Sequence, residues 1–492
     1  MQIGFLGHNG FAVGDQSSPV LIDAILLRRY GDEYTSSPVE IYPPRTIDHA
    51  AMPTPAAVII SHEHSDHFHL PSLNKIDRAV PIVVGPTMID SVVAFIEELG
   101  FSVQRMGFGE TRQFGSTLVT LYAPGRETVL WESRVSQVYV RDAADPEIGG
   151  VFLGIDALVS EDFLDDIVDG EIPAPAVIAV SNNAQVTPRG VFGSLDNLKS
   201  PQISEHIGRR TGFAGLDILQ GIVSDTLGEH PALQTCHVLI CGGGFLKDYE
   251  AMGPFPFSEQ KEMAEIASRL TRWIDVVGPE PGDIVDAGPD GINIVGKLGW
   301  LGTDTARFTE LKERRRSFLS AGESIPLRQI VPASSRGEEE ALFDEIEVEL
   351  KYLAAGILLS DLGRDLVSAG NGGESLIRPL VLKFRCMHTE DRSYALDLTQ
   401  GAFVRVDDLS LDGALKAYPY GVYTCATDFA AVVRGDLQIW DVVGIAMHSW
   451  YENEAFSSPV AIMYDALGEQ VRPDIACRAY GLQIDAIKRG VE

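Results

Sequence analysis

The feature that most constrains this chain is the segment Ser61–His67, which directly follows the apolar run Ala56–Ile60. Three histidines and one aspartate fall within six positions of this segment, although the whole chain of 492 residues holds 11 histidines. Neutral imidazole binds zinc and iron, and a carboxylate supplies negative charge to a divalent ion. The segment therefore predicts a metal site at the end of a buried strand, and a solvated loop rich in histidine is the alternative.

The string His62-x-His64-x-Asp66-His67 resembles the metal-binding signature of the metallo-β-lactamase superfamily. The opening residues 2–13, followed by 20–23, resemble the first strands of the branch that includes ascorbate-6-phosphate lactonase. The resemblance covers roughly residues 1 to 300. It implies an α/β fold in which two sheets lie between helices, as a four-layer α/β/β/α sandwich.

The pattern of apolar residues in the first 300 positions is consistent with that fold. Pro86 at a favoured first-turn position predicts a helix that continues to Leu99, and a second helix is expected over 258–273. Apolar runs predict strands at 80–84, 118–122, 136–140, 151–155, 176–180, 237–241 and 274–277. Strands and helices therefore alternate.

A chain of this length is expected to form more than one domain. We expect a metallo-β-lactamase-like domain over residues 1–302 and a charged helical linker over 303–349. An additional C-terminal α/β domain, with no assigned role, is expected over 350–492.

Composition limits the partners and the compartment. A formal net charge of −31 argues against a nucleic-acid backbone or an anionic membrane surface as a binding partner. The five cysteines show no pairing pattern, and the start of the chain lacks the features of a signal peptide. No run approaches the length of a membrane helix. We therefore expect a cytoplasmic protein, and its oligomeric state stays open.

The resemblance to the superfamily also implies roles for individual residues. It implies that His62 and His64 bind a first metal ion, and that Asp66 and His67 bind a second. An aspartate at a later strand end bridges the two ions in these proteins, and Asp156 is the residue expected there. The alternative for Asp156 is a helix cap. His8 is expected near the metals as an outer neighbour of the ligands.

The third histidine that the family uses for its first ion is missing, because no histidine lies between His69 and His206. Glu132 lies 24 residues before Asp156, which is a suitable spacing for a replacement ligand. A carboxylate there favours iron or manganese over zinc. The alternative is that Glu132 is a surface residue, and Glu127 is the reserve candidate.

The last expected ligand is a histidine for the second ion, downstream of Asp156. His206, His230 and His237 are the candidates, and His206 has the best spacing. His237 opens an apolar strand, where a core histidine is the simpler interpretation.

With a glutamate among the ligands of the first ion, the predicted site resembles that of the diiron β-hydroxylases of the superfamily, known from chloramphenicol biosynthesis. The segment 278–281 resembles a Gly-x-Glu-Pro stretch of that group. The resemblance implies a dinuclear oxygenase with two iron ions, in which Glu132 and Asp156 balance the oxidised charge. Its substrate would be a small molecule, free or carrier-bound, and its electrons would come from a donor protein or from the substrate.

A hydrolase of a lactone or phosphoester is the alternative, with zinc or manganese in place of iron. Two ions would lower the pKa of a bridging water, and Asp66 or Asp156 would orient it.

Overall fold

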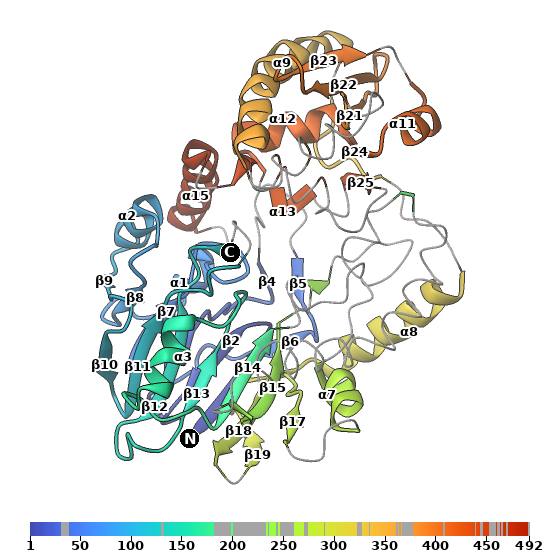
Figure 1. Ribbon diagram of the computed structural model, residues 1–492. Coiled ribbons are helices and arrows are strands. Elements are labelled where there is room, and N and C mark those ends of the chain that lie inside the picture. Colours follow the sequence, from blue (N-terminus) through green and yellow to red (C-terminus); the bar gives the residue numbers. More distant parts are fainter. Residues whose placement is uncertain are drawn as a thin grey trace.

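The structure is a computed structural model of the chain. It describes all residues except 31–38, 129–131, 182–197, 200–232, 235, 243–244, 247–259, 270–273, 290, 322–326, 334, 361–362, 364–365, 367–376, 407–408, 438, 443–445, 452–458, 460–462, 464–465, 469–470 and 491–492. The described residues form sheets of eight, seven, five, three and two strands, combined with helices (Figure 1). The predicted mixed α/β class is therefore confirmed.

The eight-stranded sheet holds the strand that leads into the histidine segment. Strand β7 pairs in parallel with β3 and β8, and the N-terminal strands β1 and β2 form an antiparallel pair. In order across the sheet, the strands are β19 (Gly291–Lys297), β18 (Asp283–Gly288), β1 (Gln2–Gly7), β2 (Gly10–Val13), β3 (Val20–Ile22), β7 (Ala57–Ile60), β8 (Ile82–Val84) and β9 (Val103–Arg105).

The seven-stranded sheet carries Asp156, the expected bridging ligand, just after one of its strands. Strands β13, β14, β15 and β17 are parallel, so β13, β14 and β15 end at the same edge of the sheet. In order, the strands are β10 (Thr111–Phe114), β11 (Thr117–Tyr122), β12 (Gln137–Asp142), β13 (Val151–Leu153), β14 (Val177–Ser181), β15 (His237–Cys241) and β17 (Val276–Val277).

Alternation of side chains along the strands places apolar residues on both faces of each large sheet. Ile59 and Leu239 belong to one core that is shared by the two sheets. Val58 and Ile60 point the other way, into a core with α1 (Leu70–Leu73), α2 (Asp90–Glu98) and α15 (Pro473–Lys488). The opposite face of the seven-stranded sheet packs against α3 (Glu161–Val168) and α7 (Gln260–Ser268).

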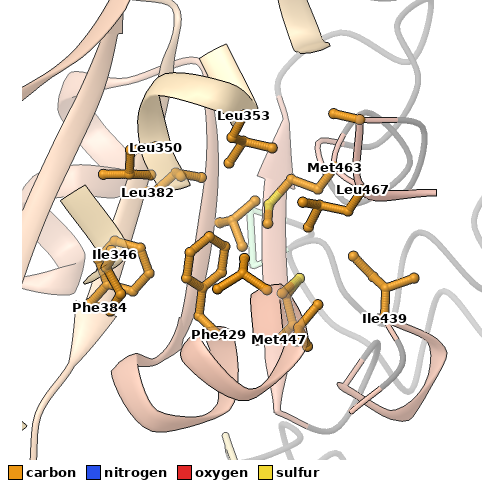
Figure 2. Packing of buried hydrophobic residues seen from close by; sticks show 14 of the residues in the cluster. Ile346, Leu350, Leu353, Leu382, Phe384, Phe429, Ile439, Met447, Met463 and Leu467 are labelled. Carbon is orange, nitrogen blue, oxygen red and sulfur yellow. The ribbon is translucent and has the colours of Figure 1, made fainter. Parts of the chain in front are cut away.

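The C-terminal third has a sheet and a core of its own. Its sheet runs in the order β23 (Ala402–Val406), β22 (Arg392–Asp397), β21 (Leu380–Arg385), β24 (Tyr420–Cys425) and β25 (Met447–Tyr451). Side chains of Leu350 and Leu353 gather with Phe429 and Met447 in one apolar cluster (Figure 2). Besides α15, the described helices of this part include α9 (Arg336–Leu359), α11 (Leu411–Ala417), α12 (Ala426–Arg434) and α13 (Ile439–Val442).

Shorter elements connect these parts. Helix α8 (Thr305–Ala321) lies in the segment that the sequence predicted to be charged and helical. The two small sheets contain β16 (Phe245–Leu246), β5 (Val39–Ile41) and β4 (Arg29–Tyr30), and β20 (Leu301–Thr303) with β6 (Arg45–Ile47). Among the described residues, no helix combines the length and apolar composition needed to cross a membrane.

One predicted helix start is wrong. The helix expected from Pro86 begins at Asp90 instead. The amide of Met88 donates to the carbonyl of Gly85 at 3.4 Å, and the Thr87 hydroxyl donates to the carbonyl of Arg134 at 2.8 Å. Residues 86–89 are therefore held as a turn by a contact with a distant segment.

Candidate metal centre

The histidine segment folds inward at the end of β7. Every residue from Ser61 to His69 is buried, so the alternative of a solvated loop is wrong. The amides of His67 and Phe68 both donate to the carbonyl of His64, at 2.9 and 2.7 Å. This tight turn brings the three histidine rings together. The centroid of the His62 ring lies 4.3 Å from that of His64 and 4.2 Å from that of His67.

The first group of candidate ligands is His62, His64 and Glu132. Oε2 of Glu132 lies 3.5 Å from Nε2 of His62 and 3.5 Å from Nδ1 of His64. Two backbone bonds position the glutamate: the amide of Val135 donates to its carbonyl at 3.1 Å, and the next amide, Ser136, donates to the carbonyl of Ser61 at 3.0 Å. Glu132 is buried, so the interpretation as a surface residue is wrong.

The second group surrounds His67. Nε2 of His67 lies 2.7 Å from Oδ2 of Asp156 and 3.5 Å from Oδ2 of Asp66. Nε2 of His8 lies 3.0 Å from the same Asp66 oxygen. His62, His67 and Asp156 also offer ligand atoms within 4.8 Å of one another, so this group adjoins the first.

These residues fit a metal ion. Two ligand atoms that bind one ion at about 2.1 Å lie roughly 3 to 3.5 Å apart. The separations of 3.5 Å within the first group match that spacing and are longer than an ordinary hydrogen bond. The buried Nε2 of His62 has no hydrogen-bond partner among the described residues. Burying such a nitrogen without a partner is unfavourable, and an ion beside it would satisfy it.

The electrostatics of the site favour a positive charge at its centre. Burial disfavours a charged His67 ring, but the carboxylates of Asp156, Asp66 and Asp23 outweigh burial and hold the pKa of His67 well above its usual value. Burial lowers the pKa of His62, and the neighbouring histidines lower it further. Burial raises the pKa of Asp66 and Asp156, but His67 outweighs this effect and lowers both. A metal ion supplies the same positive charge when His67 is neutral.

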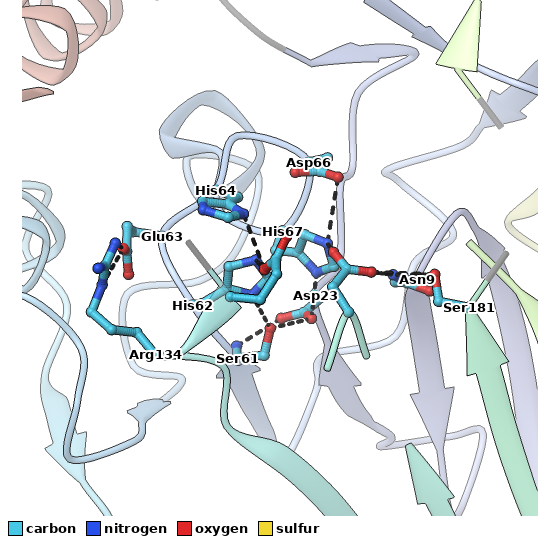
Figure 3. A network of polar contacts seen from close by, with 12 residues as sticks. Asn9, Asp23, Ser61, His62, Glu63, His64, Asp66, His67, Arg134 and Ser181 are labelled. Atoms are coloured by element: carbon cyan, nitrogen blue, oxygen red, sulfur yellow. Dashed lines mark hydrogen bonds and ion pairs between the residues drawn. The ribbon is translucent and has the colours of Figure 1, made fainter. Parts of the chain in front are cut away.

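A buried aspartate connects the two groups from behind. Oδ2 of Asp23 lies 2.8 Å from Nδ1 of His67 and accepts a hydrogen bond of 2.6 Å from the Ser61 hydroxyl (Figure 3). The Ser61 oxygen in turn lies 2.8 Å from Nδ1 of His62. One carboxylate therefore orients His67 directly and His62 through a hydroxyl. A carboxylate behind a ligating histidine fixes its tautomer and ring orientation.

Asp156 is held by the other sheet and by the turn after β1. Nδ2 of Asn9 donates to Oδ1 of Asp156 at 2.8 Å and to the Ser181 hydroxyl at 3.3 Å. The Ser181 hydroxyl donates to the same Asp156 oxygen at 3.2 Å. These bonds occupy Oδ1, while Oδ2 lies 2.7 Å from Nε2 of His67.

Three residues beside these ligands have strained backbone conformations. His8, Asp23 and Ile155 have positive φ values of 53°, 45° and 56°. Each lies at the end of a strand, and Ile155 is β-branched, for which this conformation is especially unfavourable. Such strain persists only where the surrounding structure enforces it, and it concentrates at functional sites.

Four candidate residues are not among the ligand groups found in the described part of the chain. His206 and His230 fall outside the described residues. His237 lies at the start of β15, and its Nδ1 accepts a hydrogen bond of 3.0 Å from the amide of Asp275. Ser181, which bonds to Asp156, pairs instead with the residue at the other end of β15. Glu127 is exposed and belongs to none of the ligand groups among the described residues.

Sequence reasoning missed the residues that hold the ligands in place. Asp23, Asn9, Ser61 and Ser181 were not assigned a role in advance. Their one shared signal is a polar residue at or just after the end of an apolar strand, and many strand ends without function show the same pattern.

No protein-family model and no curated protein sequence matches this chain. Solved structures align with part of it. An isothiocyanate hydrolase from gut bacteria of Delia radicum aligns at 11% identity and a TM-score of 0.37, over 59% of this chain and 100% of its own. The metallo-β-lactamase-fold protein YhfI from Bacillus subtilis aligns at 12% identity and a TM-score of 0.32, over 58% and 99%.

CmlA, a diiron β-hydroxylase from Streptomyces venezuelae, aligns at 15% identity and a TM-score of 0.33, over 56% of this chain and 52% of its own. Hydrolases and a hydroxylase are therefore both among the proteins to which this chain is similar.

Proposed function

We propose that the protein is a dinuclear-metal oxygenase of the metallo-β-lactamase fold, with two iron ions as its cofactor. The observation that carries this proposal is the first group, in which two histidines and one glutamate converge within 4.8 Å. Two histidines and one carboxylate are the ligand set of many non-heme iron oxygenases. A third histidine in place of Glu132 would favour zinc.

The fold and the domain boundaries belong to the same proposal. Two facing sheets with helices on their outer faces support a four-layer α/β/β/α domain over residues 1–302. The proposed linker covers 303–349 and the C-terminal domain covers 350–492. Helix α9 crosses position 350 and packs in the C-terminal core, so residues on both sides of that boundary share one helix.

The second ion would be held by His67 and Asp66, with Asp156 between the two ions and His206 as the last ligand. Asp156 suits this role because Asn9 and Ser181 bind one of its oxygens and the other faces His67. The three carboxylates Asp66, Glu132 and Asp156 bring negative charge to the site. Such ligands stabilise iron in its oxidised state.

When bound, reduced iron would supply the two electrons that activate O2. Hydroxylation of a C–H bond by O2 would consume these two electrons and two protons, and it would yield the alcohol and one water. An electron-donor protein is the proposed source of those electrons. A small molecule, free or attached to a carrier, is the proposed substrate, and no nucleic-acid or membrane partner is proposed for a chain with a net charge of −31.

A hydrolase of a lactone or phosphoester is the second candidate. Asp156 favours it, because its carboxylate adjoins both ligand groups and could orient a water shared by two ions. Asp66 contacts His8 and His67 and is the other carboxylate suited to that role.

The experiment that separates the two functions compares the iron-loaded and zinc-loaded protein. The protein is loaded with ⁵⁷Fe²⁺ without oxygen, and Mössbauer and optical spectra are recorded before and after exposure to O2. The proposal predicts rapid conversion to a coupled diferric centre, and loss of this reaction in Glu132→Ala. A protein that ignores O2 but cleaves lactones or phosphodiesters when zinc-loaded would refute the oxygenase and support the hydrolase.

A further inference from the structure

The C-terminal helix reaches the backbone of the histidine segment. The hydroxyl of Tyr480, on α15, donates a buried hydrogen bond of 3.1 Å to the carbonyl of Glu63. Glu63 lies between His62 and His64, two of the three candidate ligands of the first ion. This bond joins residues that are 417 positions apart in the sequence.

Packing fixes the position of Tyr480. Its side chain is buried, and its ring meets the rings of Phe68 and Phe95 edge-on, at 5.3 and 5.7 Å between centroids. Ala476 and Ile484 lie one turn before and one turn after it, in the same apolar core. The packing of this helix face therefore fixes the position of the hydroxyl.

A second contact holds the side chain of Glu63. The carboxylate of Glu63 is fully buried and pairs with the guanidinium of Arg134. Arg134 follows Glu132 by two positions, so this pair links the segment that carries the two histidines to the segment that carries the glutamate. Tyr480 holds the backbone of Glu63 while Arg134 holds its side chain.

The other end of α15 belongs to the C-terminal core. Ile475 packs in the cluster drawn in Figure 2, whereas Tyr480 packs beside α1 and α2. Gly435 ends α12 with a φ of 76°. It lies so close to α15 that a Cβ there would be 2.6 Å from the carbonyl oxygen of Ile475. One helix therefore joins the C-terminal core to the histidine segment, and Figure 1 shows it between α12 and α2.

We infer that Tyr480 is a positioning residue for the first metal ion, and that through it the C-terminal part of the chain fixes the spacing of His62 and His64. This inference rests on the proposed metal site. Groups that orient metal ligands typically change metal affinity by about 10- to 100-fold when they are removed. Because the Tyr480 hydroxyl bonds to the backbone between the two ligands, the lower end of this range is expected.

The test uses the full chain with Tyr480→Phe, which removes the hydroxyl and keeps the ring. Tyr139→Phe is the matched control, since Tyr139 is also buried and its hydroxyl also donates to a backbone carbonyl, that of Pro173 at 2.7 Å. Stepwise Co²⁺ titration against a competing chelator gives the affinity of each ion, and the visible absorption of Co²⁺ reports the geometry of its ligands.

We expect Tyr480→Phe to lower the affinity for one of the two ions by about 10-fold and to change the Co²⁺ spectrum of that ion. Tyr139→Phe should leave both affinities and the spectrum unchanged. Wild-type affinity in Tyr480→Phe, or an equal loss in both variants, would overturn the inference while leaving the proposed function intact. Failure of the wild-type protein to bind Co²⁺ would instead overturn the proposed metal site and the inference with it.

Discussion

Replacing Asp23 with Asn tests how the candidate metal centre is held together. The Asp23 carboxylate is fully buried, and it contacts Nδ1 of His67 at 2.8 Å and the amide and hydroxyl of Ser61 at 2.8 and 2.6 Å. Asparagine has nearly the same shape and tolerates the positive φ of 45° at this position. The change therefore removes the charge and one acceptor while preserving the backbone.

The size of the effect follows from these contacts. A hydrogen bond to a charged group contributes about 1.5–3 kcal/mol, and loss of an outer partner of a metal ligand weakens metal binding about 10- to 100-fold. The two ranges agree, because a 10- to 100-fold change equals about 1.4–2.7 kcal/mol. We expect this loss for the ion at His67, and a smaller loss for the ion at His62, which Asp23 reaches only through Ser61.

The assay is a stepwise Co²⁺ titration of Asp23→Asn against a competing chelator. Ser61→Ala is the matched control, since it removes the hydroxyl beside His62 and leaves the contact between Asp23 and His67. Ser61→Ala should lower the affinity for the ion at His62 alone. Two ions bound by Asp23→Asn with wild-type affinities would refute the role assigned to this carboxylate.

Three further predictions concern the metal, the pH dependence and the core. Glu132→His should raise the ratio of zinc to iron in protein purified from medium that contains both, because imidazole favours zinc; an unchanged ratio contradicts the assignment. Burial lowers the pKa of His448 to about 4, from about 6.5 in the unfolded chain, so only the unfolded state takes up this proton between those pH values. Stability should therefore fall by up to ~3 kcal/mol as the pH drops from 6.5 to 4, and His448→Phe should remove this loss in urea unfolding; an unchanged pH dependence would argue against it. Phe163→Ala should lower stability by about 3–5 kcal/mol in denaturant unfolding, because the fully buried Phe163 ring stacks on Phe152 at 3.9 Å; a loss below about 1 kcal/mol would contradict this packing.

The sequence predicts the buried strands of the two large sheets well. The strand expected over 237–241 is observed with those bounds, and the run Ala56–Ile60 yields β7, because both are short, uninterrupted apolar segments. The predicted start of α2 is wrong because Thr87 bonds to the carbonyl of Arg134, a contact that no local pattern shows. Local periodicity therefore identifies the strands and cannot locate an element that a distant segment shortens.

The site shows the same division. The resemblance to the superfamily, with the distance of 24 residues from Glu132 to Asp156, predicted that His62, His64 and Glu132 form one group. The structure brings their ligand atoms within 4.8 Å of one another. Asp23 and Tyr480 could not be predicted, because each reaches the site only through the topology of the chain. Asp23 lies beside the histidine segment because β3 and β7 are parallel neighbours. Tyr480 lies there because α15 packs against α1 and α2.

The most direct test of the central claim, that this chain holds two transition-metal ions, is the metal content of the wild-type protein. The full chain is purified from medium supplemented with iron, zinc and manganese, and the bound metals are counted by elemental analysis beside circular dichroism of the same sample. The two ligand groups predict about two ions per chain, with iron the principal metal. Folded protein with less than half an ion per chain would contradict the metal site and every function proposed from it.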